Sequence, residues 1–402
     1  MLPQASGTRG PTCVFLLTPP VLAPGKNGTR AKVVMNIDRS KEWFIRSRQT
    51  AHQHRLQPQD LERIASMFGA LAVGEPLARP SRYWEELNRM NLAQMEEHGY
   101  ENFRQTIALN YFTWVRILPW NSQFLFLCKH LPFNASLRSF WGALAGPGRG
   151  SFSAFGNLQS FTYRLLSLLL WEYLLRLPLP GPLAALREPR EGNPPLIYPR
   201  PGLGVSQDLG NSLLEYDSLQ AAIPAEGPAT IVELGGGYGR NAFVILSLHP
   251  EAKYVLVDVP PALWIAEKYL PAVFPGRRIF RYRPFDRFEK VADEYAGAQI
   301  VFLLSNQFAK IPSHSADLVL NISSLHEMRK DQIDYYLAQF DRVLKSGGHA
   351  YLKQWKIARV LFERITVSEK DYRIPSAWSP IMNRTARVQT EFFEALYKKS
   401  SA

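Results

Sequence analysis

The chain has 402 residues, of which 46% are hydrophobic and 20% charged, and its formal net charge is +12. This composition can bury a large core, which excludes a wholly disordered protein and predicts about two domains. The two cysteines, Cys13 and Cys128, show neither a disulfide framework nor metal-ligand spacing, so we expect a cytoplasmic protein.

The positive charge is concentrated near the N-terminus. Residues 1–60 hold nine Lys and Arg against three acidic residues, which is half of the excess. No stripe of basic and aromatic residues accompanies this charge, so we expect a solvated surface rather than a nucleic-acid partner. Residues 1–34 carry five prolines, no acidic residue and no apolar periodicity, which predicts a disordered extension, with Met35 as an alternative start.

Helical periodicity dominates the region 35–177. Apolar residues recur three and four positions apart in 84–90 and 103–112, which predicts a helical N-terminal domain that suits homodimerisation. The apolar stretch 161–177 contains charged residues at near-helical spacing, so it predicts an amphipathic helix rather than a membrane span. We therefore expect no membrane partner.

A proline-rich segment separates this region from a second domain. Eight prolines fall within residues 178–201, so we predict a linker at 178–202 and a second domain at 203–402. From Ala229, short apolar runs alternate with helical stretches, which predicts an α/β fold with a parallel, Rossmann-like sheet. Strands are predicted at 230–234, 254–258, 300–304, 317–322 and 348–354, with a further short strand at 278–283 and a closing hairpin of 357–367 with 388–396.

Glycines follow the first of these strands at every second position. They are Gly235, Gly237 and Gly239, with Gly236 between them, directly after Glu233 and Leu234. Backbone without side chains approaches a ligand closely, and a helix at 241–248 would direct its N-terminal amides at an anionic group. A dinucleotide fingerprint needs glycine at the sixth position, where this chain has Arg240, and the Gly-Lys-Ser/Thr of a phosphate-binding loop is absent.

Polar residues at the ends of two further strands add to the site. Asp258 lies 19 residues after Gly239 at the end of the next strand, where its carboxylate can accept both hydroxyls of a ribose. After the third core strand, Asn306 or Gln307 could bond the edge of a base while Phe308 packs on its face. A plain polar turn is the alternative for these three residues.

With these residues identified, the chain resembles class I S-adenosylmethionine-dependent methyltransferases and, more narrowly, the sugar O-methyltransferase family. The broad resemblance rests on 233–240, Asp258 and 316–321. The narrow one covers roughly residues 80–398 and rests on Ser206-Gln207-Asp208, Asn211-Ser212, Glu215-Tyr216, 321–328, 352–355 and 392–394. The resemblance implies a Rossmann-like class I methyltransferase sheet with a helical N-terminal domain, S-adenosyl-L-methionine as the cofactor, and a sugar hydroxyl of a glycan or glycosylated metabolite as the acceptor.

Transfer to a hydroxyl requires alignment of the acceptor and a base that takes its proton. His326 is the one histidine that follows a core strand, so we expect His326 or the adjacent Glu327 to be catalytic; a structural histidine and a helix-start acid are the alternatives. The family usually has glutamine at the position of His326. Expected cofactor contacts are Glu233, Gly235, Gly236, Gly237, Gly239, Asp258, Asn306, Gln307 and Asn321, and expected acceptor contacts are Ser324, Gln354 and Trp355.

Other interpretations stay open. No acidic pair follows the fourth strand, so we expect metal-independent transfer. That strand is also not followed by an Asp/Asn-Pro-Pro-aromatic tetrapeptide, which disfavours methylation of amino groups on bases. The alternatives are a natural-product O-methyltransferase that acts on a non-sugar hydroxyl and a module that binds S-adenosylmethionine without turnover.

Overall fold

The computed structural model describes residues 56–107, 121–145, 157–179, 186–360 and 363–401. All of these belong to the second of two units of the chain, Ser47–Ala402. The predictions for residues 1–34, Met35 and Cys13 lie outside the described residues. The helices are α2 Pro58–Ala72, α3 Arg82–His98, α5 Ser122–His130, α6 Phe133–Ala145, α7 Asn157–Leu174, α9 Gln207–Leu219, α10 Arg240–Leu248, α11 Pro260–Val273, α12 Ala292–Gly297 and α13 Lys330–Val343.

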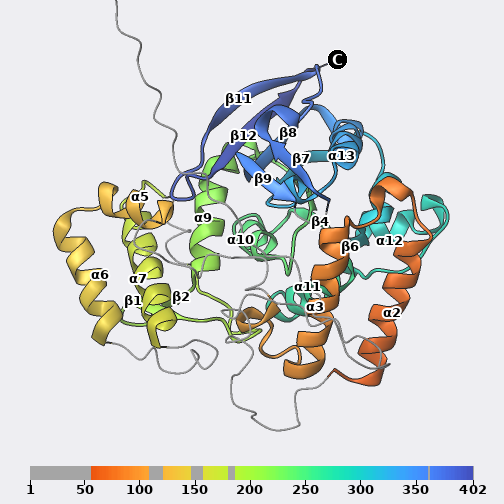
Figure 1. Ribbon diagram of the computed structural model, residues 1–402. Helices are drawn as coiled ribbons and strands as arrows, with labels where there is room; N and C mark the ends of the chain where they lie inside the picture. The colour runs from red at the N-terminus through yellow and green to blue at the C-terminus, as the bar shows by residue number, and fades with distance from the viewer. Residues whose placement is uncertain (1–55, 108–120, 146–156, 180–185, 361–362, 402) are drawn as a thin grey trace, which may run out of the picture. The chain divides into compact units, whose positions relative to one another are not determined.

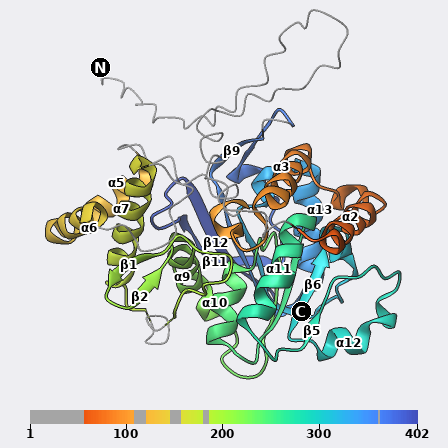
Figure 2. The ribbon, with the colours of Figure 1, turned by 90° about the horizontal axis from the view of Figure 1, so that it is seen from below.

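Eight of the described strands form one sheet in the order β11-β12-β8-β7-β3-β4-β6-β5 (Figures 1 and 2). The strands from β8 to β5 are parallel, whereas β12 runs antiparallel to both β8 and β11. The bounds are β3 Thr230–Leu234, β4 Lys253–Asp258, β5 Ile279–Phe280, β6 Ile300–Leu304, β7 Ala316–Ile322, β8 Leu344–Trp355, β11 Trp378–Thr385 and β12 Phe392–Lys399. The predicted α/β, Rossmann-like fold is therefore confirmed.

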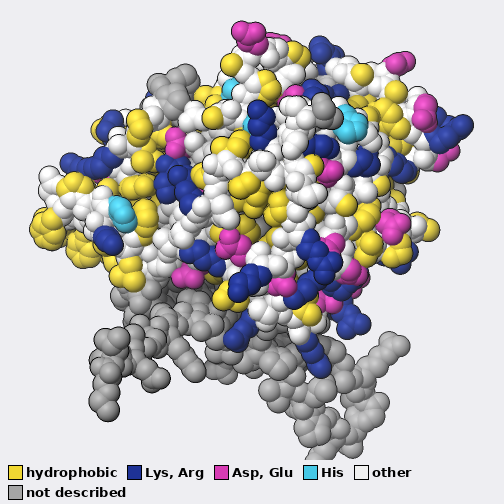
Figure 3. Space-filling model, turned by 90° about the horizontal axis from the view of Figure 1, so that it is seen from above, with side chains coloured by type: hydrophobic (Ala, Val, Ile, Leu, Met, Phe, Trp, Pro, Cys, Tyr) yellow, Lys and Arg dark blue, Asp and Glu magenta, His cyan; other side chains and the backbone are white. Residues whose placement is uncertain are grey.

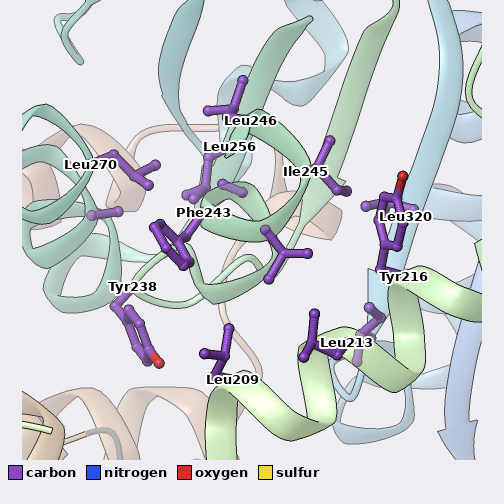
Figure 4. Close-up of a cluster of buried hydrophobic side chains, with 14 of the residues drawn as sticks. Leu209, Leu213, Tyr216, Tyr238, Phe243, Ile245, Leu246, Leu256, Leu270 and Leu320 are labelled. Atoms are coloured by element: carbon purple, nitrogen blue, oxygen red, sulfur yellow. The ribbon is translucent and has the colours of Figure 1, made fainter. Parts of the chain in front are cut away.

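Alternate residues of the strands feed two apolar cores, because successive side chains point to opposite faces of a sheet. Along β4, Tyr254 and Leu256 pack with α9, α10 and α11, whereas Val255 and Val257 pack on the opposite face with α12 and α13. Figure 4 shows the first core where Leu209, Leu213 and Tyr216 of α9 lie below α10. The central strands are thus covered on both faces, as parallel strands require.

The helices before the sheet pack in two groups. α2 and α3 contact α11, and α7 contacts both α6 and α9. A separate hairpin of β1 Ile197–Arg200 and β2 Leu203–Val205 joins α7 to α9 and contacts α7. Among the described helices, none combines the length and the apolar content that crossing a membrane demands.

The sequence-based prediction that residues 357–367 form the first strand of a closing hairpin was wrong. Residues 357–367 fall mostly in β9 Ile357–Val360 and β10 Ile365–Ser368, which form a two-stranded sheet of their own within the described part of the chain. β11 instead closes the sheet beside β12. β11 is an edge strand that contains Pro380 and exposes most of its side chains, so it carries little apolar alternation for sequence analysis to detect.

Candidate active site

A pocket of about 420 Å³, including its open mouth, lies at the carboxyl ends of β3, β4, β6 and β7. The strand order reverses here, because the chain passes from β3 outward to β4 and later returns to β7 on the other side of β3. Ligands of open parallel sheets bind in the crevice at such a point. The sheet side of the pocket includes Leu234, Gly235, Asp258, Val259, Ser305 and Ser324.

Gly235, the first residue of the glycine loop Gly235–Gly239, lines this site. Gly235 has φ +76°, and a Cβ built on it would lie 2.5 Å from Ser324 Oγ, so a larger residue would collide there. Gly237 has φ +60°, yet a Cβ built on it would meet nothing within 4 Å. Gly235 is therefore required by its protein neighbours, whereas Gly237 leaves open space beside the backbone.

Asp258 ends β4 beside this loop. Its Oδ2 accepts the Gly237 N–H at 2.6 Å, and its Oδ1 accepts the Val259 N–H at 2.6 Å. Burial raises the pKa of Asp258 to about 7, and the two backbone hydrogen bonds offset only part of that rise. The carboxylate lines the pocket and is poised to change its charge near neutral pH.

Glu233 holds the loop from below. Its carboxylate accepts hydrogen bonds from Tyr254 Oη at 2.6 Å and Asn241 Nδ2 at 3.2 Å, and burial raises its pKa. A Cβ on Gly236 would lie 2.8 Å from Glu233 Oε2. Glu233 is 1% exposed and its carboxylate is used within the fold, so its contribution is to support the loop.

The residues proposed for a base edge have partners within the protein, apart from Asn306 Oδ1, which is buried with no partner among the described residues. Asn306 Nδ2 donates to Ala70 O at 2.9 Å. Gln307 Nε2 donates to Arg283 O, and its Oε1 accepts the Leu304 N–H. Phe308 is fully buried and packs against Tyr336 and Phe340. Of this turn, Ser305 is the residue that lines the pocket.

A buried amide network joins the ends of three strands. Asn321 Nδ2 donates to Leu234 O at 2.9 Å and to Ser324 Oγ at 2.6 Å. Gln354 Nε2 donates to Asn321 Oδ1 at 2.6 Å and to Asn321 O at 3.0 Å. Asn321 and Gln354 are both 0% exposed, so they set the geometry of the edge, whereas Ser324 reaches the pocket.

This network also orients His326. Because Gln354 Nε2 is used by Asn321, Gln354 Oε1 faces His326 and accepts its Nδ1–H at 2.9 Å. The lone pair of the neutral ring is thereby on Nε2. Burial lowers the pKa of His326 to about 4, and the bond to Gln354 offsets only part of that.

Glu327 lies beside His326, with Oε1 3.8 Å from His326 Nε2. Burial raises its pKa well above the usual range, even though hydrogen bonds from Tyr83 and Trp84 oppose the rise. The negative charge of Asp258 adds to the upward shift. Among the described residues, Glu327 Oε2 has no hydrogen-bond partner. The Trp355 ring centroid lies 6.4 Å from that of His326 and packs on Phe392 at 4.6 Å.

The helix α9 holds the glycine loop through charged contacts. Asp208 Oδ2 accepts the hydroxyl of Tyr238 at 2.9 Å, and the buried Arg104 lies 5.0 Å from the Tyr238 ring. One turn apart on this helix, Gln207 Nε2 and both polar atoms of Asn211 are buried with no partner among the described residues. Buried polar atoms of this kind call for a bound ligand or water.

A buried ion network secures the base of the same helix. Glu215 contacts Arg240 Nη1 at 2.6 Å and Lys353 Nζ at 2.8 Å, and Glu215 and Lys353 are both 2% exposed at the side chain. Although burial opposes it, the two cations lower the pKa of Glu215 to about 2. The network therefore links α9 to the first residue of α10 and to β8.

Sequence analysis missed the helical side of the pocket. This side includes Arg79, Ser81 and Trp84 from the start of α3 and the segment before it, and Gln332 and Tyr336 from α13. Ser81 Oγ donates to Glu327 O at 3.0 Å, and Gln332 Nε2 donates to Arg79 O at 2.7 Å. Nothing local in the sequence marks these residues, because their partners lie more than 240 positions away along the chain.

No protein-family model and no curated protein matches the sequence. A S-adenosylmethionine-dependent methyltransferase of Methanosarcina mazei is 15% identical over 46% of this chain and 99% of its own, with a TM-score of 0.34. One from Mesorhizobium loti is 15% identical over 46% and 98%, with a TM-score of 0.30. The 1,6-didemethyltoxoflavin-N1-methyltransferase of Burkholderia thailandensis, solved with S-adenosylhomocysteine, is 12% identical over 47% and 76%, with a TM-score of 0.28. At these scores the likeness carries no argument about the function of this chain.

Proposed function

We propose that this chain is an S-adenosylmethionine-dependent O-methyltransferase whose acceptor is a sugar hydroxyl. The observation that carries the proposal is the arrangement around the pocket at the strand-order reversal. Gly235, Asp258 and Ser324 line its sheet side together, and Glu327 follows Ser324 by three positions in the chain. A ribose-binding acid, a side-chain-free loop and a proton acceptor are the parts that this reaction needs.

The residues fit the cofactor. Gly237 leaves open space beside its backbone, and the buried carboxylate of Asp258 faces the pocket, where it would accept the ribose hydroxyls. The unpartnered amides of Gln207 and Asn211 lie on the helix that holds Tyr238 of the glycine loop, so they would suit the polar methionyl group. When bound, the cofactor supplies an electrophilic methyl group.

Glu327 is the better candidate for the base. Burial raises the pKa of Glu327, which makes its carboxylate a stronger proton acceptor, whereas it lowers the pKa of His326 to about 4, which makes the imidazole a weaker one. His326 contributes as a neutral ring next to the carboxylate, held by Gln354. Tyr83 and Trp84 orient Glu327 from the helical side.

The sugar acceptor is supported by the chemistry around Glu327 together with the sequence resemblance. Trp84 lines the pocket and bonds Glu327, which combines an aromatic ring with a carboxylate. An aromatic face suits the C–H groups of a sugar ring, and a carboxylate suits its hydroxyls.

The test is mass spectrometry of a panel of glycosides incubated with the purified full chain and S-adenosylmethionine. We expect gain of one methyl group on a glycoside, and loss of that gain in the Glu327→Gln variant. Methylation of phenols but not of sugars would favour the natural-product alternative. Tight binding of S-adenosylhomocysteine without methylation of any acceptor class would favour the non-catalytic alternative.

A further inference from the structure

Helix α6 buries small side chains and exposes large apolar ones, which is the reverse of the usual arrangement on a surface helix. The helix packs on α7, and its buried residues are the small Ala135, Ser139 and Ala143, each at most 2% exposed. Its large apolar side chains are exposed, with exposed fractions of 81% for Phe133, 59% for Trp141, 51% for Leu144, 43% for Leu137 and 40% for Phe140, whose ring also contacts Phe161 of α7 edge-on. We call these five residues the α6 stripe.

The α6 stripe forms one continuous face. At 3.6 residues per turn its members fall within an arc of roughly 100°. Leu125 of the neighbouring α5 adds a side chain that is 54% exposed. A surface helix ordinarily buries its large apolar residues, and a contiguous exposed patch marks an interaction site. Helices that face lipid have this pattern: small residues lie where two helices pack together, and large apolar residues face outward.

The surroundings of the α6 stripe are positively charged. No Asp or Glu occurs between Glu101 and Glu172 in the sequence. Lys129 is exposed at the end of α5, and Arg138 of α6 is 64% exposed. Glu172 is the nearest acid along the chain, and Arg138 and Arg176 both bind it, so that cluster keeps a positive charge. Figure 3 shows hydrophobic side chains with basic ones beside them at the left edge, where Figure 1 has α6.

We propose that the α6 stripe and Leu125 form a peripheral docking surface for an anionic lipid bilayer. Trp, Phe and Leu would enter the boundary between headgroups and acyl chains, while Lys129 and the Arg138 cluster meet the anionic headgroups. A second copy of the chain is the less favourable occupant, because a symmetric contact would bring the same basic groups together. This proposal departs from the sequence-based expectation of no membrane partner, which was argued from the lack of a spanning segment, because a peripheral contact requires none.

The docking surface is separate from the proposed catalytic site. No member of the α6 stripe lines the pocket at the carboxyl edge of the sheet. The inference goes beyond the proposed function, so its failure would leave the methyltransferase proposal intact. Substitutions on the stripe are also expected to leave the fold intact, because Phe133 and Trp141 are more than half exposed.

Co-sedimentation of the full chain with vesicles tests the proposal. We expect binding to phosphatidylcholine vesicles that contain phosphatidylserine, and much weaker binding to phosphatidylcholine alone. The double variant Phe133→Ser, Trp141→Ser should weaken binding by about tenfold or more, because two large apolar side chains no longer enter the lipid. The matched control is Ile357→Ser, Ile381→Ser, since these side chains are 59% and 56% exposed on β9 and β11, and it should bind as the wild type does.

Three results would overturn the proposal. The first is no binding to either kind of vesicle, in which case an acidic protein would be the better candidate to cover the α6 stripe. The second is equal binding of the stripe variant and the control variant. The third is a dimer, measured by light scattering without lipid, that the stripe variant converts to a monomer while the control variant does not. Circular dichroism and thermal melting of both variants confirm that each is folded.

Discussion

Gln354 accepts the Nδ1–H of His326 at 2.9 Å while its own amide protons go to Asn321. This contact leaves the lone pair of the neutral imidazole on Nε2, the nitrogen 3.8 Å from Glu327 Oε1. Gln354, near the end of β8, therefore determines that Nε2 of His326 is the unprotonated nitrogen and lies nearest the Glu327 carboxylate. Burial shifts the pKa values of these two side chains in opposite directions, because it lowers the pKa of His326 and raises that of Glu327.

Removing the Glu327 carboxylate should slow methyl transfer more than removing the imidazole. We expect Glu327→Gln to lower kcat by about 10²–10⁴, because an amide cannot accept the acceptor's proton. His326→Gln should cost less than about tenfold, since an amide can still donate to Gln354. Steady-state kinetics with a methylated glycoside as the readout compares the two variants. A larger loss in His326→Gln would identify the imidazole as the base.

Cofactor binding should weaken as the pH falls below neutral. The folded-state pKa of Asp258 is raised to about 7, so the carboxylate that would accept the ribose hydroxyls is increasingly protonated below pH 7. The Kd of S-adenosylhomocysteine, measured by calorimetry, should rise by up to about tenfold per pH unit below that pKa. Asp258→Asn should bind more weakly and lose this pH dependence. The control Asp317→Asn lies at the opposite end of the sheet, beside Lys345, and should keep the wild-type profile.

Gly237→Ala should impair cofactor binding far more than it impairs folding. The substitution costs about 1–2 kcal/mol for the left-handed backbone, but it meets no protein atom within 4 Å. Gly276→Ala is the matched control, because Gly276 also has a positive φ and open space beside it. We expect similar losses of Tm in both variants and a raised Kd of S-adenosylhomocysteine in Gly237→Ala alone. Equal Kd values would show that the cofactor does not approach Gly237.

Glu215 should stabilise the fold above about pH 4.3 and lose that contribution in acid. Its folded-state pKa is lowered to about 2, below the ordinary value of about 4.3, so the stabilisation is present above the ordinary pKa and disappears as the pH falls towards 2. The difference corresponds to roughly 3 kcal/mol.

Glu215→Gln would leave two buried cations partly unpaired and should lower the free energy of unfolding by about 3–5 kcal/mol at pH 7. Urea unfolding at pH 7 and pH 3 measures this, and the gap between wild type and variant should narrow at pH 3. The surface pair of Glu86 with Arg89 supplies the control, because Glu86→Gln should change stability by less than about 1 kcal/mol. An equal difference in the free energy of unfolding between wild type and Glu215→Gln at pH 7 and pH 3 would argue against the lowered pKa of Glu215.

Much of the sheet could be predicted because its central strands are buried on both faces. The predicted strands 230–234 and 300–304 match β3 and β6. A short, continuous apolar run bounded by turns is typical of a strand that is buried on both faces. β11 escaped prediction because an exposed edge strand lacks that signal. The glycines could be identified because three of them have a positive φ, which restricts the residue type locally, and Asp258 because it ends a buried strand.

The sequence by itself determined the parallel sheet and the loop and acid at its carboxyl edge, because those follow from local patterns of hydrophobicity and glycine. Only the tertiary structure decided what those residues face. Ser81 and Trp84 reach Glu327 across more than 240 positions of sequence, and Gln354 selects the tautomer of His326 from another strand. Burial, and with it each pKa shift, depends on everything that packs around a group, so no local pattern in the sequence records it.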